Sequence, residues 1–191
     1  MIQNISYYFS KKLSSNTEEQ EVLQYGFECL INTLIPTIFF FIFAIVQNMI
    51  IETIIWIVLF LLLRNYIGGY HASSHGRCIT ISTFYGLLTL FCIYYFNSIP
   101  LIVEICSCSI ITIFHILFGP IINDNDLTEN YRKYKIIGLI IIIGESTLML
   151  ILNFSNIEIH SCLFFSLVST EILHYVERVK RLCVALFLLV Q

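Results

Sequence analysis

The segment Phe27–Arg64, FECLINTLIPTIFFFIFAIVQNMIIETIIWIVLFLLLR, decides the fold class of this chain. It is mostly apolar and is divided by a tight polar break at Gln47 and Asn48. A helix that crosses a bilayer needs about 20 mostly apolar residues. The segment therefore predicts two successive membrane spans, Phe27–Gln47 and the shorter Met49–Arg64.

The same pattern continues along the rest of the chain. Of its 191 residues, 58% are hydrophobic and only 12% are charged, whereas a soluble domain carries about 25% charged residues. Further apolar runs predict four more spans, of which Glu158, His160 and Glu171 interrupt the last: Ile79–Phe96, Leu101–Ile122, Ile136–Phe154 and Ile157–Tyr175. We expect one all-α, polytopic integral membrane domain over residues 1–191, with six transmembrane helices.

The basic residues predict the orientation of these spans. All ten lie before the first span, in the second or fourth connection, or after the sixth span: Lys11, Lys12, Arg64, Arg77, Arg132, Lys133, Lys135, Arg178, Lys180 and Arg181. Because cytoplasmic connections carry an excess of Lys and Arg, both termini are expected in the cytoplasm of a multi-pass cell-membrane protein. A four-span arrangement with interfacial segments would use the same charges. The net charge of -3, without a basic run, argues against a nucleic-acid partner.

Both flanks are too short or too polar to cross the bilayer. Residues 1–26 mix apolar residues with Lys and Glu, which favours an amphipathic segment on the inner membrane surface. Residues 176–191 are expected to form a cytoplasmic or interfacial tail. The N-terminus lacks the basic, apolar and small-residue regions of a signal peptide, so we expect the mature protein to begin near Met1.

The segment 64–78, RNYIGGYHASSHGRC, differs from a plain linker because it concentrates His, Gly and basic residues on the predicted cytoplasmic side. A cysteine nucleophile needs a base that takes its proton, and the resulting imidazolium stabilises the thiolate. His71 and Cys78 are candidates for this pair, and His75 is an alternative base. On a continuous helix, seven residues would separate His71 from Cys78 by about 10.5 Å. The segment must therefore bend, and its glycines supply the backbone freedom.

Other interpretations of these polar residues stay open. A polar loop with a free cysteine is common, and His71, His75 and Cys78 stand at the spacing of three zinc ligands on one helix face. Glu28, at the inner end of the first span, could orient the histidine or pair with Arg64. A membrane carrier or channel is a further alternative, in which the polar path would be lined by Glu28, Glu145 and Glu171.

With these residues in view, the sequence resembles the accessory gene regulator protein B (AgrB) family of membrane cysteine peptidases. The resemblance rests on an Arg, then Gly-x-His-Ala, then a Cys seven residues beyond the His, which correspond here to Arg64, Gly69–Ala72 and Cys78. Tyr25–Glu28 is similar to the family's Tyr-Gly-x-Glu element. The stretch from Gly119 to Lys135 is similar to its central loop, although Asp124, Asp126 and Glu129 make it less basic.

The resemblance implies an activity and a set of functional residues. By this match Cys78 corresponds to the nucleophile and His71 to the catalytic base, while Glu28, Arg64 and Gly69 fall on supporting positions. The implied substrate is an AgrD-like propeptide whose acidic tail is removed in the cytoplasm, with the remainder held as a thioester on Cys78 and then cyclised. Arg64 or Arg77 is a candidate to bind the departing acidic tail. A homodimer is implied, and neither a cofactor nor a metal is.

Overall fold

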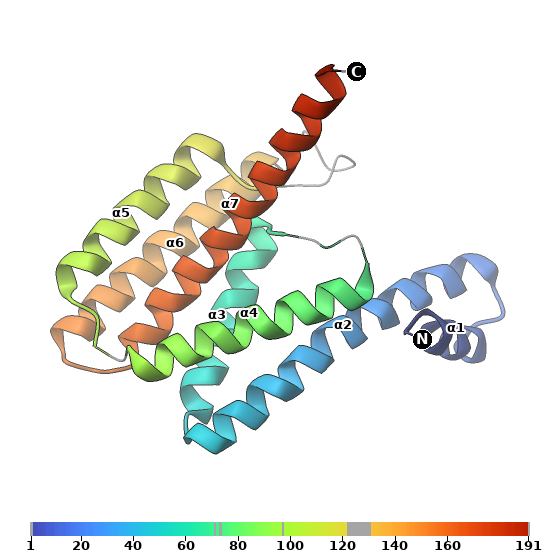
Figure 1. Cartoon of the computed structure of the whole chain (residues 1–191), viewed down its shortest axis with the longest axis horizontal. Helices are drawn as coiled ribbons and strands as arrows, with labels where there is room; N and C mark the ends of the chain where they lie inside the picture. The colour runs from blue at the N-terminus through green and yellow to red at the C-terminus, as the bar shows by residue number, and fades with distance from the viewer. Residues whose placement is uncertain (1, 71, 73, 97, 122–130, 191) are drawn as a thin grey trace. The chain divides into compact units, whose positions relative to one another are not determined.

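The computed structural model describes residues 2–70, 72, 74–96, 98–121 and 131–190 (Figure 1). Across these residues the chain forms seven α-helices and no strand, which confirms the all-α prediction. Two compact units can be distinguished, Met1–Asn48 with Ala72–Leu90, and Met49–His71 with Phe91–Gln191. Each unit is described by itself below.

The first unit contains two N-terminal helices and most of a third. Their bounds are α1 Ile2–Leu13, α2 Thr17–Gln47 and α4 His75–Tyr95. The polar residues Ser14–Asn16 separate α1 from α2, and the Asn16 side chain accepts a 3.2 Å hydrogen bond from the Glu18 amide. An Asn that caps the first turn starts a helix in this way. The residues expected to form an amphipathic N-terminal segment are thus divided between α1 and the start of α2.

Aromatic and glycine packing hold this unit together. The rings of Phe9 in α1 and Phe27 in α2 lie 5.6 Å apart between their centres. The Phe40 ring of α2 lies directly against Gly86 of α4, where no space remains for a Cβ atom. Gly86 therefore leaves room for the Phe40 ring.

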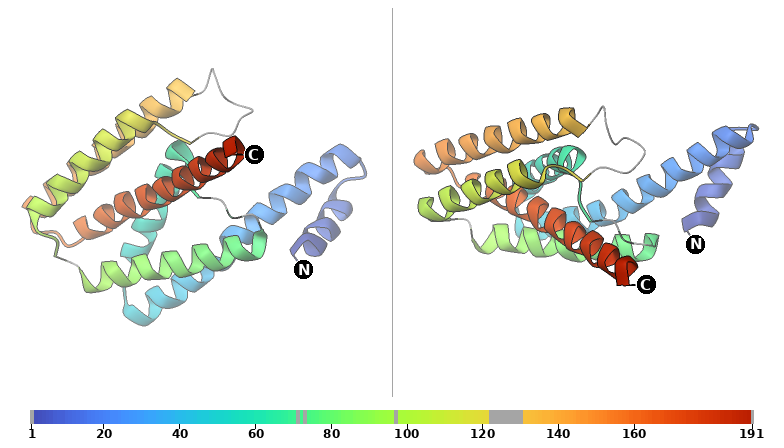
Figure 2. Two further views of the ribbon diagram at one scale, coloured as in Figure 1. Left: turned by 45° about the horizontal axis from the view of Figure 1, so that its top comes forward. Right: turned by 90° about the horizontal axis from the view of Figure 1, so that it is seen from above.

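The second unit is a helical bundle. Its complete helices are α3 Ile50–Ile67, α5 Leu101–Phe118, α6 Tyr131–Phe154 and α7 His160–Val190. Helices α5, α6 and α7 run side by side, and α3 packs against α6 and α7 (Figure 2). Since α5, α6 and α7 follow one another up and down, the start of α5 lies with the end of α6 and the start of α7.

Among the residues that the structure describes, five helices are long and apolar enough to cross a membrane, namely α2, α3, α4 from Gly76, α5 and α6. They coincide with the first five predicted spans, so the multi-pass membrane architecture is confirmed. The most marked difference is at α2, which begins at Thr17 rather than Phe27. Helix α5 ends at Phe118 rather than Ile122 because Gly119 turns the chain with φ +66°.

Helix α7 covers the sixth predicted span but is less apolar than the other five. Its polar side chains are buried inside the bundle, including Ser166, Ser169, Thr170 and His174. A helix that packs against three neighbours needs less apolar surface toward lipid than a peripheral one. The helix also continues without a break through residues 176–190, where a separate tail was expected.

Polar contacts link the start of α5 to its neighbours. The buried Glu104 carboxylate contacts His160 Nδ1 at 2.6 Å and accepts a 2.8 Å hydrogen bond from Asn153 Nδ2. Asn153 also donates to the Ile99 carbonyl at 3.1 Å. These contacts tie α5, α6 and α7 together at one end of the bundle.

Candidate active site

Cys78 lies in the first turn of α4, in the first unit. Its amide donates a 2.9 Å hydrogen bond to the Ser74 carbonyl, and its side chain is a partly exposed free thiol. The unpaired amides of a helix start favour a negative charge nearby, which suits a thiolate. The predicted loop 64–78 is therefore shorter in the structure, because α3 extends to Ile67 and α4 begins at His75.

Glu28 belongs to the same unit as Cys78 and lies in the N-terminal half of α2. The residue is 8% exposed, and its carboxylate accepts a 3.2 Å hydrogen bond from Gln24 Nε2, one turn earlier. This hydrogen bond offsets part of the free energy that burying the carboxylate without a partner would cost. A role of Glu28 toward the histidine stays a prediction.

Arg64 lies in the last turn of α3, in the second unit. Its guanidinium donates a 3.0 Å hydrogen bond to the Tyr70 carbonyl and lies 5.9 Å from the centre of the Phe60 ring. A hydrogen bond from a charged donor to a carbonyl is stronger than one from a neutral donor. Arg64 thus fixes the backbone of the residue that directly precedes His71 in the sequence.

Gly68 gives this segment its direction. Its backbone has φ +80° and ψ -170°, a region that is essentially open only to glycine. The Ile121 amide donates a 2.9 Å hydrogen bond to the Ile67 carbonyl, and a Cβ on Gly68 would collide with the Ile121 carbonyl oxygen. The chain leaving α3 therefore lies against the chain leaving α5.

The other two glycines of the motif have different environments. Gly69 has no positive φ, and a Cβ there would meet the Leu173 Cβ at 3.7 Å and Arg64 Nε at 3.9 Å, which are ordinary contacts. Gly76 lies within α4, where a Cβ would find nothing within 4 Å. Of the three glycines, Gly68 alone has a positive φ.

The motif contains two histidines, His71 and His75. His71 lies outside the described residues, and His75 is the first residue of α4 with its side chain likewise outside. The pairing of His71 with Cys78, and His75 as an alternative base, stay predictions. Within the part of the chain that the structure describes, no group of three or more His, Cys, Asp or Glu side chains could hold a metal ion.

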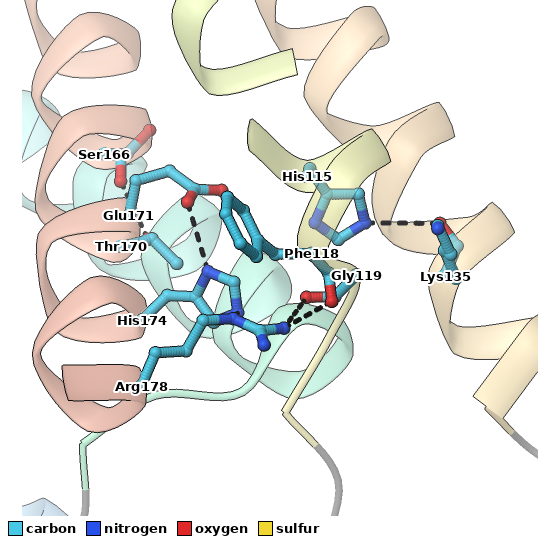
Figure 3. Close-up of polar contacts among 9 residues, drawn as sticks. All are labelled: His115, Phe118, Gly119, Lys135, Ser166, Thr170, Glu171, His174 and Arg178. Atoms are coloured by element: carbon cyan, nitrogen blue, oxygen red, sulfur yellow. Dashed lines mark hydrogen bonds and ion pairs between the residues drawn. The ribbon is translucent and has the colours of Figure 1, made fainter. Parts of the chain in front are cut away.

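A second polar cluster, not predicted from the sequence, lies at the end of the bundle where α5 ends (Figure 3). Three side chains of α7 form a line, since His174 Nδ1 lies 3.3 Å from Glu171 Oε2 and Arg178 Nε lies 3.2 Å from His174 Nε2. Arg178 also donates to the Phe118 carbonyl at 2.6 Å and to the Gly119 carbonyl. We call Glu171, His174 and Arg178 the α7 triad.

The hydrogen bonds of the α7 triad define the protonation of its histidine. An arginine Nε–H can only donate, so His174 Nε2 accepts from Arg178 and carries no proton. The proton is then on Nδ1, which donates to Glu171 Oε2. Burial lowers the pKa of Arg178 from its ordinary value, but a guanidinium keeps its charge in proteins. The triad therefore directs one positive charge toward the carbonyls at the end of α5.

Helix α6 completes the cluster from the other side. Lys135 Nζ donates a 2.7 Å hydrogen bond to the Ile116 carbonyl, and the Lys135 carbonyl lies 3.3 Å from His115 Nε2. The Tyr131 hydroxyl lies 3.4 Å from the Phe118 carbonyl. His115, assigned no function from the sequence, thus links α5 to α6. In the sequence, the i, i+3, i+7 spacing of the α7 triad indicates that its three residues share one face of a helix.

Together these features define a polytopic helical membrane protein with a free cysteine at the start of a membrane-spanning helix and a glycine-turned segment before it. The chain belongs to the Accessory gene regulator B family, whose model matches residues 2–175.

Curated relatives agree with this assignment. Two proteins from two strains of Clostridium perfringens, each named provisionally as AgrB-like, are 37% identical to this chain over 97 residues. The match covers 49% of this chain and 44% of each relative, so the chain matches less than half of their length. No solved structure matches the chain.

Proposed function

We propose that this protein is a membrane cysteine endopeptidase that removes the C-terminal tail of an AgrD-like propeptide and promotes cyclisation of the remainder into a quorum-sensing peptide. Membership of the Accessory gene regulator B family over residues 2–175 carries this proposal. Cys78 supports it, because it is a partly exposed free thiol in the first turn of α4. The distribution of basic residues supports an active site on the cytoplasmic side.

The proposed reaction divides one cleavage into two acyl transfers. His71 accepts the thiol proton, and the Cys78 thiolate attacks the scissile carbonyl. The C–N bond then breaks, the departing amine takes the proton from the His71 imidazolium, and the propeptide remains as a thioester on Cys78. A Cys or Ser within the same peptide attacks this thioester, which closes the ring and returns the thiol of Cys78.

The supporting residues have distinct proposed roles. Arg64 holds the Tyr70 carbonyl and so fixes the backbone next to His71. Gly69 lies beside Leu173 and Arg64, and its supporting role is proposed from the family resemblance. Glu28 is proposed to stabilise the imidazolium that forms during the reaction. No cofactor is required by this chemistry, and a homodimer is proposed from the family resemblance.

Mass spectrometry of the protein in liposomes tests the proposal. The substrate is a synthetic propeptide with a membrane-binding leader, an internal Cys and an acidic C-terminal tail. We expect tail release and a covalent adduct on Cys78 in the unmodified protein, and neither in Cys78→Ala or His71→Ala. Cys92→Ala, in the same helix, is the matched control and should retain both. Tail release that survives Cys78→Ala would contradict the mechanism.

A further inference from the structure

The end of α7 contacts both chain segments that leave the neighbouring helices α3 and α5. These segments are Gly68–Tyr70, which precedes His71, and Phe118–Ile121. The contacts come from the α7 triad and from two further residues of α7, Leu173 and Lys180. Through these contacts, Arg178 of α7 affects the backbone that precedes His71.

Arg178 is the residue through which α7 holds the segment leaving α5. It is half-buried, and its guanidinium binds the carbonyls of Phe118 and Gly119 while its Nε binds His174. It also lies 5.5 Å from the centre of the Phe118 ring. With these contacts made inside the protein, Arg178 is poorly placed to bind the acidic tail of a substrate.

The segment held by Arg178 in turn holds the segment leaving α3. Two residues after Gly119, the Ile121 amide donates to the Ile67 carbonyl at 2.9 Å. The Ile121 carbonyl contacts Gly68 so closely that no side chain fits there. A displacement of Gly119 would therefore move Gly68 as well.

Helix α7 also contacts the α3 segment directly. Leu173 lies beside Gly69, and Lys180 Nζ lies 5.0 Å from the centre of the Tyr70 ring. The Tyr70 carbonyl also accepts a hydrogen bond from Arg64. Tyr70 directly precedes His71 in the sequence.

We propose that Arg178 is a positioning residue for His71. The α7 triad orients its guanidinium, the guanidinium fixes Phe118–Ile121, and that segment fixes Gly68–Tyr70. This inference rests on the proposed function, in which His71 is the base for Cys78. It assigns a role in the reaction to a helix that supplies neither the nucleophile nor the base.

The reaction of Cys78 with iodoacetamide tests this proposal without a propeptide. Only the thiolate reacts at an appreciable rate, so the alkylation rate against pH reports how the thiol ionises. Peptide mapping by mass spectrometry follows each cysteine of the full-length protein in liposomes. We expect the half-maximal pH for Cys78 to rise by about one unit or more in His71→Ala, and Arg178→Gln to shift it in the same direction.

Three comparisons make the outcome decisive. Arg181→Gln removes the same charge one turn later, where Arg181 contacts Glu177 at 3.3 Å, and should leave the profile unchanged. Cys162 is fully buried, so its resistance to alkylation reports an intact fold. If Arg178→Gln exposes Cys162, Arg178→Lys decides instead. It keeps the charge without the planar fork, and an intermediate shift is expected.

The possible failures are distinguishable. A wild-type profile in His71→Ala would contradict the proposed His71–Cys78 pair itself. A shift in His71→Ala together with a wild-type profile in the folded Arg178 variant would leave the pair intact and overturn the positioning role. Equal shifts in Arg178→Gln and Arg181→Gln would also overturn it, since they would indicate a general effect of charge.

Discussion

Gly68 and Gly119 adopt nearly the same conformation, with φ +80° and +66° and ψ -170° and -173°. Each ends its helix by donating its amide to the carbonyl four residues earlier, in Arg64 and His115 respectively. Each then turns the chain through a conformation that a side chain would strain. Each of the two segments that meet beside α7 therefore begins with a glycine in the same backbone conformation.

The conformation of Gly68 predicts how an added methyl group changes the stability of the protein. Gly68→Ala should lower the free energy of unfolding by about 2 kcal/mol or more, because the alanine is strained and its Cβ collides with the Ile121 carbonyl. Gly144→Ala, exposed in α6 with open space around it, should be neutral or stabilising by up to about 1 kcal/mol. Thermal unfolding in detergent compares the two, and equal losses would contradict the conformational argument.

Arg64 gives a second prediction at this scale. Arg64→Gln removes a charge-assisted hydrogen bond to the Tyr70 carbonyl, so acyl-enzyme formation should slow by about tenfold or more with KM nearly unchanged. Arg64→Lys keeps a charged donor and should be less impaired. Single-turnover kinetics with the synthetic propeptide measures both. A large rise in KM with an unchanged rate would instead indicate that Arg64 binds the substrate tail.

At the scale of the elements, the contact of Glu104 with His160 predicts coupling between α5 and α7. His160→Leu leaves a fully buried carboxylate without its closest partner, which should cost about 3 kcal/mol. Glu104→Leu in the same chain should recover part of this loss. A double-mutant cycle by thermal unfolding measures the coupling. Strictly additive effects would show that the pair does not join the helices.

Glu145 distinguishes the peptidase from the carrier. Its carboxylate is buried in α6 and accepts a hydrogen bond from Ser166 of α7. Since a glutamine can accept the same bond, Glu145→Gln should leave propeptide processing within about twofold of the unmodified protein. No tail release by the unmodified protein, together with transport across the liposome membrane that Glu145→Gln abolishes and Cys78→Ala retains, would favour the carrier. The assay is tail release in liposomes.

The sequence predicts some of these elements better than others. Helices α2 to α6 follow from long apolar runs, and Arg64 and Cys78 stand out because they bound a polar, glycine-containing segment. The α7 triad was not predicted. The spacing of its three residues places them on one helix face, but the carbonyls that Arg178 contacts belong to Phe118 and Gly119, far earlier in the sequence. Backbone carbonyls carry no sequence signal, so only the approach of the two helices in the fold reveals their partner.

At the scale of the whole molecule, the orientation in the membrane is the main prediction. If α7 crosses the bilayer, Ser155→Cys and the native Cys183 should lie on opposite sides, with Ser98→Cys on the same side as residue 155. A membrane-impermeant maleimide applied to intact cells should label positions 98 and 155 but not Cys183. Labelling of both Cys183 and residue 155 from outside would contradict a sixth span.

The buried polar face of α7 also affects how the protein is made. Serines, a threonine, two histidines and glutamates that are sheltered in the finished bundle would face lipid if α7 entered the bilayer alone, and insertion from the translocon penalises such residues. Helices α3, α5 and α6, which cover this face, are synthesised before it. Membrane integration of α7 is therefore a late step of biogenesis that depends on the earlier helices, because they shelter its polar side chains from lipid.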